Sequence, residues 1–247
     1  VEDASPSVPL VGVLENIVKS LLDAHVPCGI ITDKDIGSLG RFQVIIVPDM
    51  IMMDEREARA FEGFVRSGGA LYVSRRTSLI GKDGVRRPNF LLAELLGVDY
   101  LGETDETVTY LAPSAGAEAL FWGHCRKYPL MISDRQAKVR AGAGTSTLAT
   151  LTLPFSRPGD TVRFTAAISN PPGIETEFPS LVMKSCGSGK TIYSSAGIEM
   201  MEHESHRSIF VGLIRMLMSR PPVYELLDAP KSVEATVFHQ AAHNRFI

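Results

Sequence analysis

The sequence predicts an α/β fold built around a parallel sheet, and residues 41–74 carry most of the evidence. Val44–Val47 is a run of four β-branched residues, which is typical of a strand that helices cover on both faces. A helix that begins at Asp54 and ends at Gly68-Gly69 separates this run from a second apolar run, Ala70–Ser74. Two strands joined by a helix pair in parallel through a right-handed crossover. We therefore expect a β-α-β unit here.

The helix of this unit carries signals at both ends. Asp54 is a natural N-cap, and Glu57 three residues later gives an Asp version of the capping box. The paired glycines that follow can adopt the positive φ that a helix end requires. The apolar residues at helical spacing are Ala58, Phe61, Phe64 and Val65.

The segments ahead of this unit alternate in the same way. Apolar residues at helical spacing predict a helix over residues 10–24, and Cys28–Thr32 predicts a short buried strand. Residues 33–36 then form a single helical turn. A doubly wound sheet normally opens with a strand, and residues 1–9 do not have a strand pattern. We therefore expect the first strand to be missing, or to lie upstream of Val1 in a longer parent protein.

The middle of the chain has a different texture. After a short helix at residues 90–96 and a strand at residues 98–101, residues 104–178 consist of short β-rich runs separated by Gly, Pro, Ser and Asn. Such runs predict antiparallel hairpins. They are Thr107–Leu111, Ala137–Val139, Leu148–Leu153 and Val162–Ile168. We expect residues 104–178 to form a β-rich insertion against the sheet.

The α/β pattern returns near residue 181. Leu181–Met183, a turn at Gly187–Gly189 and Thr191–Tyr193 predict a hairpin, and an amphipathic helix follows from Ser205. Pro221 ends that helix. We expect residues 1–220 to form one α/β domain, and the strand-like runs of residues 221–247 to begin a C-terminal β domain.

The amino-acid composition argues against several classes of binding partner. The 25 Lys and Arg against 28 Asp and Glu give no electrostatic argument for nucleic acid or a membrane surface, and no apolar run could span a bilayer. Cys28, Cys125 and Cys186 are odd in number and far apart, which argues against a disulfide framework and a zinc site. Free thiols favour a reducing, cytoplasmic compartment. We expect no metal and no cofactor.

Three features suggest chemistry, and none of them meets the requirements of the site that it suggests. Residues 184–191, KSCGSGKT, end like a phosphate-binding loop, but β-forming residues follow, so a hairpin turn is favoured. An amidotransferase-type nucleophile would stand on the elbow at residues 74–78, which contains no cysteine. His203 and His206 have no obvious third metal ligand, and a solvated helix start is favoured.

Polar residues also follow the predicted strands. In open α/β sheets, ligands bind beyond the carboxyl ends of the strands. This rule selects Asp33, Asp49, Arg75 and Arg76 as a candidate crevice for a small polar ligand. A surface ion pair or a subunit contact is favoured, because no nucleophile or base accompanies them.

The order of these features along the chain resembles that of a known protein family. Residues 21–84 share an AHVP helix end, a VP strand end, a GG helix stop and a TS loop ending in DG with the amidotransferase-like middle domain of family 42 β-galactosidases and related glycoside hydrolases. Residues 178–198 resemble that domain's hairpin, and residues 232–240 resemble the start of its C-terminal β domain. The likeness is weakest over residues 104–178.

The resemblance implies a flavodoxin-like, class I glutamine amidotransferase-like fold without the catalytic cysteine. In that family, the domain mediates trimer assembly and the glycosidase carboxylates lie on an upstream TIM barrel, which this chain does not resemble. No catalytic residue is therefore assigned here. The expected role is structural, in a homo-oligomer, whereas the alternatives are a hydrolase with a cysteine nucleophile and a sugar-binding module.

Overall fold

The computed structural model describes residues 10–157, 160–165, 170–222 and 224–247. The helices of these residues, including short 3-10 helices labelled η, are α1 (Leu10–Asp23), η1 (Asp33–Arg41), α2 (Glu55–Arg66), α3 (Ala93–Leu96), η2 (Glu118–Phe121), η3 (Ile198–Met200), α4 (Glu204–Leu217) and η4 (Ala241–His243). The strands are β1 (Val44–Val47), β2 (Ala70–Ser74), β3 (Val98–Glu103), β4 (Thr109–Pro113), β5 (Leu130–Ile132), β6 (Ala137–Ala141), β7 (Thr145–Pro154), β8 (Pro172–Cys186), β9 (Gly189–Ser194), β10 (His239–Gln240) and β11 (Arg245–Phe246).

The main sheet is mixed rather than parallel throughout. Its order is β1-β2-β9-β8-β7-β4-β5, and only β1, β2 and β9 pair in parallel. The strands from β8 to β5 pair antiparallel. The α/β class is confirmed. The sheet is mixed rather than parallel, because β9 follows β8 through a tight turn and a hairpin joins antiparallel strands.

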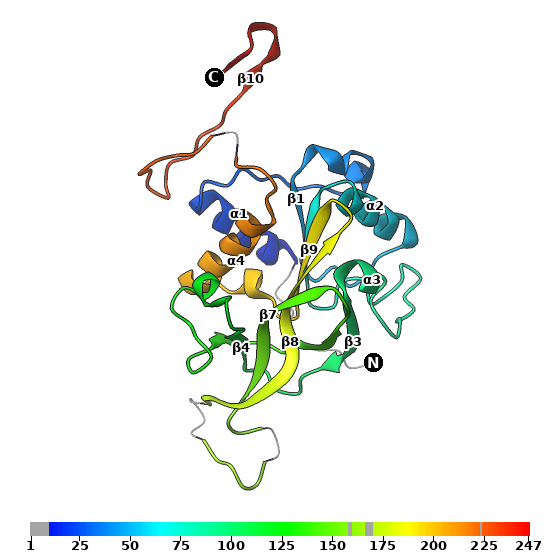
Figure 1. The fold of residues 1–247 in the computed structure, drawn as a ribbon, viewed down its shortest axis with the longest axis vertical. Helices are drawn as coiled ribbons and strands as arrows, with labels where there is room; N and C mark the ends of the chain where they lie inside the picture. The colour runs from blue at the N-terminus through cyan, green and yellow to red at the C-terminus, as the bar shows by residue number, and fades with distance from the viewer. Residues whose placement is uncertain (1–9, 158–159, 166–169, 223) are drawn as a thin grey trace.

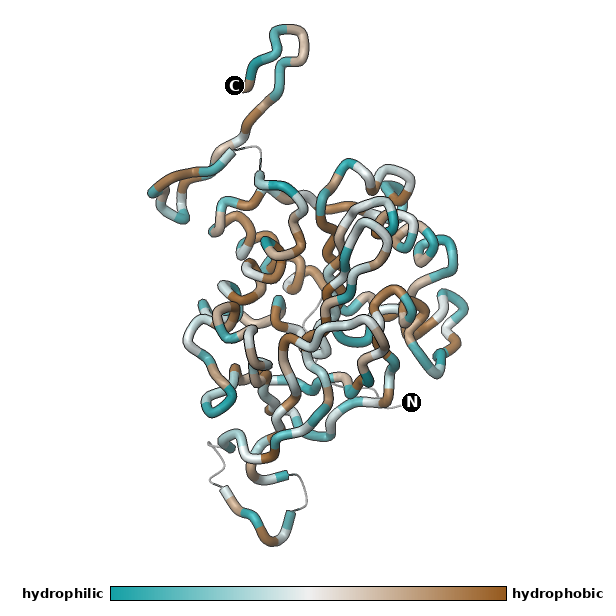
Figure 2. Tube along the Cα trace, in the orientation of Figure 1, coloured by the Kyte–Doolittle hydropathy of each residue, from teal (hydrophilic) through white to brown (hydrophobic). Residues whose placement is uncertain are grey.

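Helices lie on both faces of the parallel part of this sheet (Figure 1), and a hydrophobic cluster fills the space on each face. On one face, Leu71 and Val73 pack with α2, α3 and η1. On the other, Tyr72 packs with α1 and α4, and its ring meets that of Phe210 edge-on at a centroid distance of 5.3 Å. Neighbouring residues of β2 thus serve opposite clusters, as the side-chain alternation of a strand requires. Figure 2 shows the hydrophobic residues concentrated in this body.

The predicted β-α-β unit is confirmed, with β1 and β2 in parallel register from Val44 opposite Ala70. At the start of α2, the Asp54 carboxylate accepts a hydrogen bond from the Glu57 N–H at 2.8 Å, and the Glu57 carboxylate accepts one from the Asp54 N–H at 2.9 Å. The capping box read from the sequence therefore forms and fixes where the crossover helix begins.

The glycine-rich motif of residues 184–191 is a hairpin turn between β8 and β9, as predicted. The turn lies against the end of α2, where the Ser188 N–H donates to the Arg66 carbonyl at 3.2 Å. A Cβ on Gly189 would collide with the carbonyl oxygens of Val65 and Gly69. The glycines therefore permit close contact between two backbones and do not surround a phosphate.

The predicted strand at Cys28–Thr32 is wrong. The segment is not part of a strand, and Ile30 is 64% exposed. It has no strand beside it among the described residues, because β1 pairs with β2 and leaves a groove between β1 and this segment. A short apolar run has the composition of a strand, but only a neighbouring strand can satisfy its backbone.

The strands within residues 104–178 join the main sheet and a second, two-stranded sheet of β3 and β6. β7 and β8 form one long curved hairpin, so that β8 begins at Pro172, well before the predicted Leu181. The predicted strand at residues 162–168 is absent over 162–165, and its remainder lies outside the described residues. Residues 104–178 thus supply strands that extend the main sheet.

Residues 224–247 leave the body as an extended segment, which Figure 1 shows projecting from the end where α4 finishes. Its paired residues are the short antiparallel β10 and β11. The predicted runs at residues 224–227 and 233–238 are not strands. Leu227, Phe238 and Phe246 are at least 60% exposed, so this segment has no core of its own.

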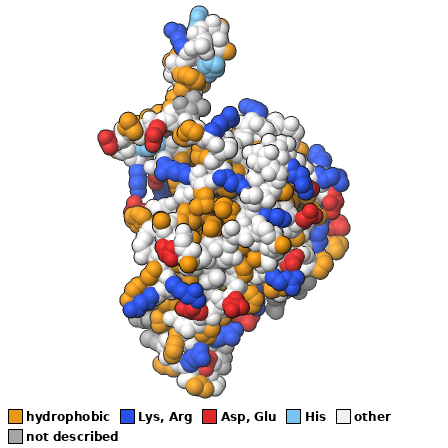
Figure 3. Space-filling view, viewed as in Figure 1, with side chains coloured by type: hydrophobic (Ala, Val, Ile, Leu, Met, Phe, Trp, Pro, Cys, Tyr) orange, Lys and Arg blue, Asp and Glu red, His pale blue; other side chains and the backbone are white. Residues whose placement is uncertain are grey.

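The surface carries mixed charge. Figure 3 shows Lys and Arg interspersed with Asp and Glu over one face, without a large patch of either sign. No helix among the described residues is long and apolar enough to cross a bilayer.

The hairpin packing gives a matched pair of glycine substitutions. Gly189→Ala should destabilise the protein by about 1–3 kcal/mol, because its methyl group meets two fixed carbonyls. Gly63→Ala, at an exposed site inside α2 with nothing within 4 Å of the new Cβ, should stabilise it by about 0.5–1 kcal/mol. Urea unfolding measures both. Equal effects at the two positions would contradict the close packing of hairpin and helix.

Candidate functional site

Three of the four predicted crevice residues meet at the carboxyl ends of β1 and β2. The Asp49 carboxylate accepts from the Arg76 side chain at 2.9 Å and lies 3.8 Å from Nε of Arg75. Asp33, by contrast, is exposed at the start of η1. It depended on a strand at Cys28–Thr32 that does not form, so the rule for strand ends does not place it in the crevice.

The cluster gains a fourth member that the sequence did not indicate. Asp134, in the loop after β5, accepts a hydrogen bond from the Arg75 guanidinium at 2.6 Å. The side chains of Arg75, Arg76, Asp49 and Asp134 are only 4%, 11%, 11% and 22% exposed. This is a network of alternating charges, so each guanidinium faces a carboxylate and the cost of burying the charges is offset within the cluster.

The backbone at this point forms a strained elbow. Arg75 follows β2 directly and has a φ of 51°, and Asp49 has a φ of 41° after β1. The Arg75 N–H donates to the Ser194 carbonyl at 2.7 Å, and the Tyr193 hydroxyl donates to the Arg75 carbonyl at 2.9 Å. A left-handed conformation costs a non-glycine residue about 1–2 kcal/mol. Bonds to β9 on both sides of the residue hold it there.

A buried glutamic acid lies directly behind the elbow. Glu199, in η3, is 1% exposed, and its carboxyl group accepts from the Tyr72 hydroxyl at 2.8 Å and from the Ser74 hydroxyl. Burial raises the pKa of Glu199, against the opposing effect of these hydrogen bonds. The Ser74 hydroxyl also accepts from the Asp49 N–H at 3.1 Å, so Glu199 and the ion network share one strand end.

Glu199 was missed at the sequence level because Thr191–Tyr193 was taken only as half of a hairpin. β9 is also parallel to β2, so the rule for carboxyl ends applies to it and selects the residues that follow Ser194. Asp134 left no such signal. It reaches Arg75 through the packing of β5 and β4 at the far side of the sheet.

The cysteines lie away from the elbow. Cys28 is exposed in the segment before η1, Cys125 is half-buried in the loop between η2 and β5, and Cys186 ends β8. His206 is buried, and its ring nitrogen Nε2 lies 2.7 Å from the Met131 carbonyl, with the ring of His203 5.8 Å away. Among the described residues, no group of three or more His, Cys, Asp or Glu is arranged to hold a metal ion.

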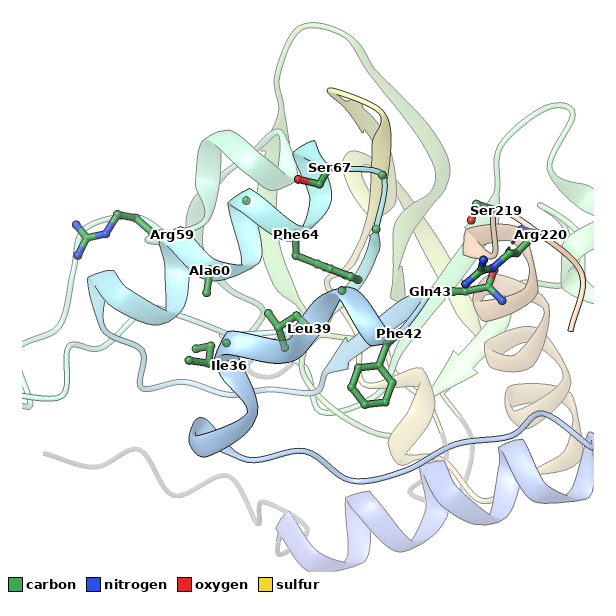
Figure 4. Close-up of a pocket in the computed structure, with 15 residues that line it drawn as sticks. Ile36, Leu39, Phe42, Gln43, Arg59, Ala60, Phe64, Ser67, Ser219 and Arg220 are labelled. Atoms are coloured by element: carbon green, nitrogen blue, oxygen red, sulfur yellow. Dashed lines mark hydrogen bonds between the residues drawn. The ribbon is translucent and has the colours of Figure 1, made fainter. Parts of the chain in front are cut away.

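A concave surface of about 480 Å³ lies at the opposite, amino edge of the sheet. Figure 4 shows Leu39, Phe42 and Phe64 in its middle and Arg59 and Arg220 at its two ends. The two guanidinium groups do not converge on a common point (Figure 4). This surface therefore lacks the converging polar groups of a ligand site.

The groups at the elbow are engaged in ion pairs and hydrogen bonds with one another. The position that would carry a nucleophile holds Arg75, whose guanidinium is engaged by two carboxylates. Glu199 is buried with hydroxyl partners for both oxygens. The arrangement joins the ends of β1, β2 and β9 and the loop after β5 through charge and hydrogen bonds, and it presents no unpaired catalytic group.

No protein-family model matches the sequence, and no curated protein matches it. Solved structures of similar fold exist, however. A β-galactosidase from Rahnella sp. R3 superposes with a TM-score of 0.63 at 18% identity, over 86% of this chain and 28% of that one. A GH42 β-galactosidase from G. stearothermophilus gives 0.63 at 13%, over 88% and 27%. The chain thus spans about 28% of the length of the Rahnella enzyme.

Smaller proteins share the fold over most of their length. A ThuA-like protein from Bacteroides uniformis superposes with a TM-score of 0.58 at 15% identity, over 88% of both chains. At these identities the similarity is one of fold. The resemblance to part of the family 42 β-galactosidases is confirmed at that level.

Substitution of Arg75 tests how much the ion network contributes to the stability of the folded protein. Arg75→Gln leaves the Asp134 carboxylate without an ionic partner and leaves Asp49 with Arg76 alone, so we expect a loss of about 3 kcal/mol in the free energy of unfolding. The matched control is Arg66→Gln, which breaks an exposed pair with Glu62 and should cost about 0.5 kcal/mol or less. Chemical denaturation compares them. A similar small loss for both would show that the ion pairs of Arg75 do not stabilise the fold more than an exposed pair does.

Glu199 should make stability depend on pH. Its raised pKa in the folded protein means that the folded state binds the proton more tightly than the unfolded state. The contribution is therefore fully present below the unfolded pKa and is lost as pH rises through the folded pKa. Glu199→Gln should lose less stability than the wild type between about pH 5 and about pH 8. Urea unfolding at both pH values checks this, with exposed Glu202→Gln as the control that should follow the wild type.

Proposed function

We propose that this chain is a non-catalytic structural domain of a larger, β-galactosidase-like glycoside hydrolase whose catalytic barrel lies elsewhere in the parent protein. The observation that carries the proposal is the identity of the elbow residue. A nucleophile in an amidotransferase-type site stands on the strained turn after a central strand, and here that turn holds Arg75, buried and paired with carboxylates.

The comparison with solved structures supports the proposal independently. The β-galactosidases share the fold over about 28% of their own length, as expected if this chain corresponds to one domain of such enzymes. The finer assignment, a flavodoxin-like or class I amidotransferase-like domain over residues 1–220 with a β-rich insertion at 104–178, is part of the same proposal. So is the start of a C-terminal β domain in residues 221–247.

Within this proposal the domain contributes to assembly of the parent enzyme as a homo-oligomer, with a trimer as the expected form. The extended C-terminal segment favours a role within a larger molecule, because its side chains Leu227, Phe238 and Phe246 are at least 60% exposed. An obligate contact of this kind buries about 2,000 Å² or more. Sedimentation of the purified chain measures the oligomer directly.

Activity measurements separate this proposal from a cysteine hydrolase. Purified Val1–Ile247 should leave chromogenic β-galactosides and simple amides unhydrolysed, and Cys28→Ser, Cys125→Ser and Cys186→Ser should each behave like the parent chain. Loss of a measured activity in any one of them would establish a catalytic thiol and overturn the proposal. Titration of simple sugars by calorimetry tests the third role, because heat from binding that disappears in Asp49→Asn would indicate a sugar site at the elbow.

A further inference from the structure

Residues 122–128 form a loop between η2 and β5, and none of their side chains is fully buried. The backbone of this η2–β5 loop is ordered by its own hydrogen bonds. The His124 N–H donates to the Phe121 carbonyl at 3.0 Å, and Cys125 and Tyr128 exchange two bonds of 3.1 and 3.0 Å. Because the loop adds no buried side chain to the core, its position depends on the contacts at its two ends.

Both ends of the η2–β5 loop lie against α4. At the first end, Leu120 of η2 packs on Gly212, where a Cβ would come within 3.1 Å of the leucine side chain. At the other end, the Nε2 atom of His206 donates to the Met131 carbonyl of β5 at 2.7 Å. The first contact is apolar and does not change with pH. The second requires an imidazole in one protonation state, so it can respond to pH.

The His206 ring is bound in its neutral form, and it is only 4% exposed. A carbonyl oxygen can only accept a hydrogen bond, so Nε2 carries the ring hydrogen and Nδ1 keeps a lone pair. Nδ1 is buried, and no described residue forms a hydrogen bond with it. A second proton would therefore create a buried N–H without an acceptor, together with a buried positive charge. Both are unfavourable.

The titratable groups that act on His206 are two further histidines. The ring of His203, at the N-cap of α4, lies 5.8 Å away, and His124 acts from the η2–β5 loop. Burial lowers the pKa of His206, the bond to Met131 opposes this effect, and the two histidines lower the pKa further. None of the other charged side chains described on these segments bonds to His206; they are Glu118, Arg126 and Lys127 on the loop side and Glu202, Glu204 and Arg207 on the α4 side.

We propose that His206 is a pH-sensitive switch, in which the neutral ring holds the η2–β5 loop and β5 against α4 and the protonated ring lets them open. On protonation the ring turns to water, where both of its N–H groups find acceptors, and the Met131 carbonyl loses its donor. β5 is a three-residue strand at the edge of the main sheet, and β4 is its one partner among the described strands. Asp134, which follows β5, remains paired with Arg75. The opening is therefore confined to residues 122–132, and it does not depend on the proposed function.

Hydrogen exchange of the chain Val1–Ile247 at about pH 7.5 and about pH 5 tests the switch. The closed form binds the proton on His206 less tightly than the open form, so it is favoured at the higher pH and loses stability as the pH falls. Protection factors of the hydrogen-bonded amides of the η2–β5 loop, corrected for intrinsic exchange, should fall about tenfold or more at the lower pH. Those of Leu71 and Val73 in β2 should not fall, because protonation of Glu199 acts in the opposite direction. Equal protection of the loop at both pH values, or the same fall in β2, overturns the proposal.

Trp122 provides an independent readout, because it is the single tryptophan of the chain and lies in the η2–β5 loop, 62% exposed. Its fluorescence anisotropy should fall as the loop opens, with a midpoint below about pH 6.5. His206→Gln keeps a side-chain N–H for the Met131 carbonyl but does not titrate, so it should remove the transition. His203→Gln removes a neighbouring charge and should raise the midpoint, whereas the exposed His239→Gln should follow the wild type. The absence of a transition in the wild type, or its persistence in His206→Gln, contradicts the switch.

Discussion

Parallel pairing of β2 with β1 and β9 is the constraint on which the rest of the structure depends. β2 is buried at all five positions, so its backbone can be satisfied only by strands on both sides and its side chains only by helices on both faces. That requirement sets the layers, because Leu71 and Val73 need the α2 side while Tyr72 needs the α4 side. It also brings the three carboxyl ends to one line, where the polar residues after each strand must face one another.

Ion pairs and hydrogen bonds join the carboxyl ends of these three strands. Asp49, Arg75 and Asp134 neutralise one another in a place with little water, and Ser74 links this network to the buried carboxyl group of Glu199. A buried charge is costly when isolated and tolerable when opposed at hydrogen-bonding distance. Hydrogen bonds to β9 hold the Arg75 backbone at its positive φ. In this conformation the guanidinium contacts Asp134, which follows a strand of the antiparallel half of the sheet.

Local sequence signals succeeded where the physical cause is local. The capping box at Asp54 and Glu57 and the turn at Gly187 could be recognised because their hydrogen bonds or φ angles involve residues a few positions apart. The convergence of Asp49 with Arg75 and Arg76 was also predictable, since strand ends in a parallel unit share an edge. The prediction for Asp33 was wrong because its cause is not local. Its place depended on Cys28–Thr32 having a neighbouring strand, which is a property of the whole sheet.

The sequence by itself determined the α/β class, the β-α-β unit, the hairpin at Gly187–Gly189 and the absence of a cysteine from the elbow, because each follows from periodicity, capping or turn chemistry over short distances. Only the tertiary structure decided that β9 is parallel to β2 as well as antiparallel to β8, that Asp134 and Glu199 join the elbow, and that β1 has an open edge. The contacts of Arg75 with Asp134 and of Ser74 with Glu199 join residues 59 and 125 positions apart in the sequence, and no local pattern specifies which distant carboxylate will be the partner.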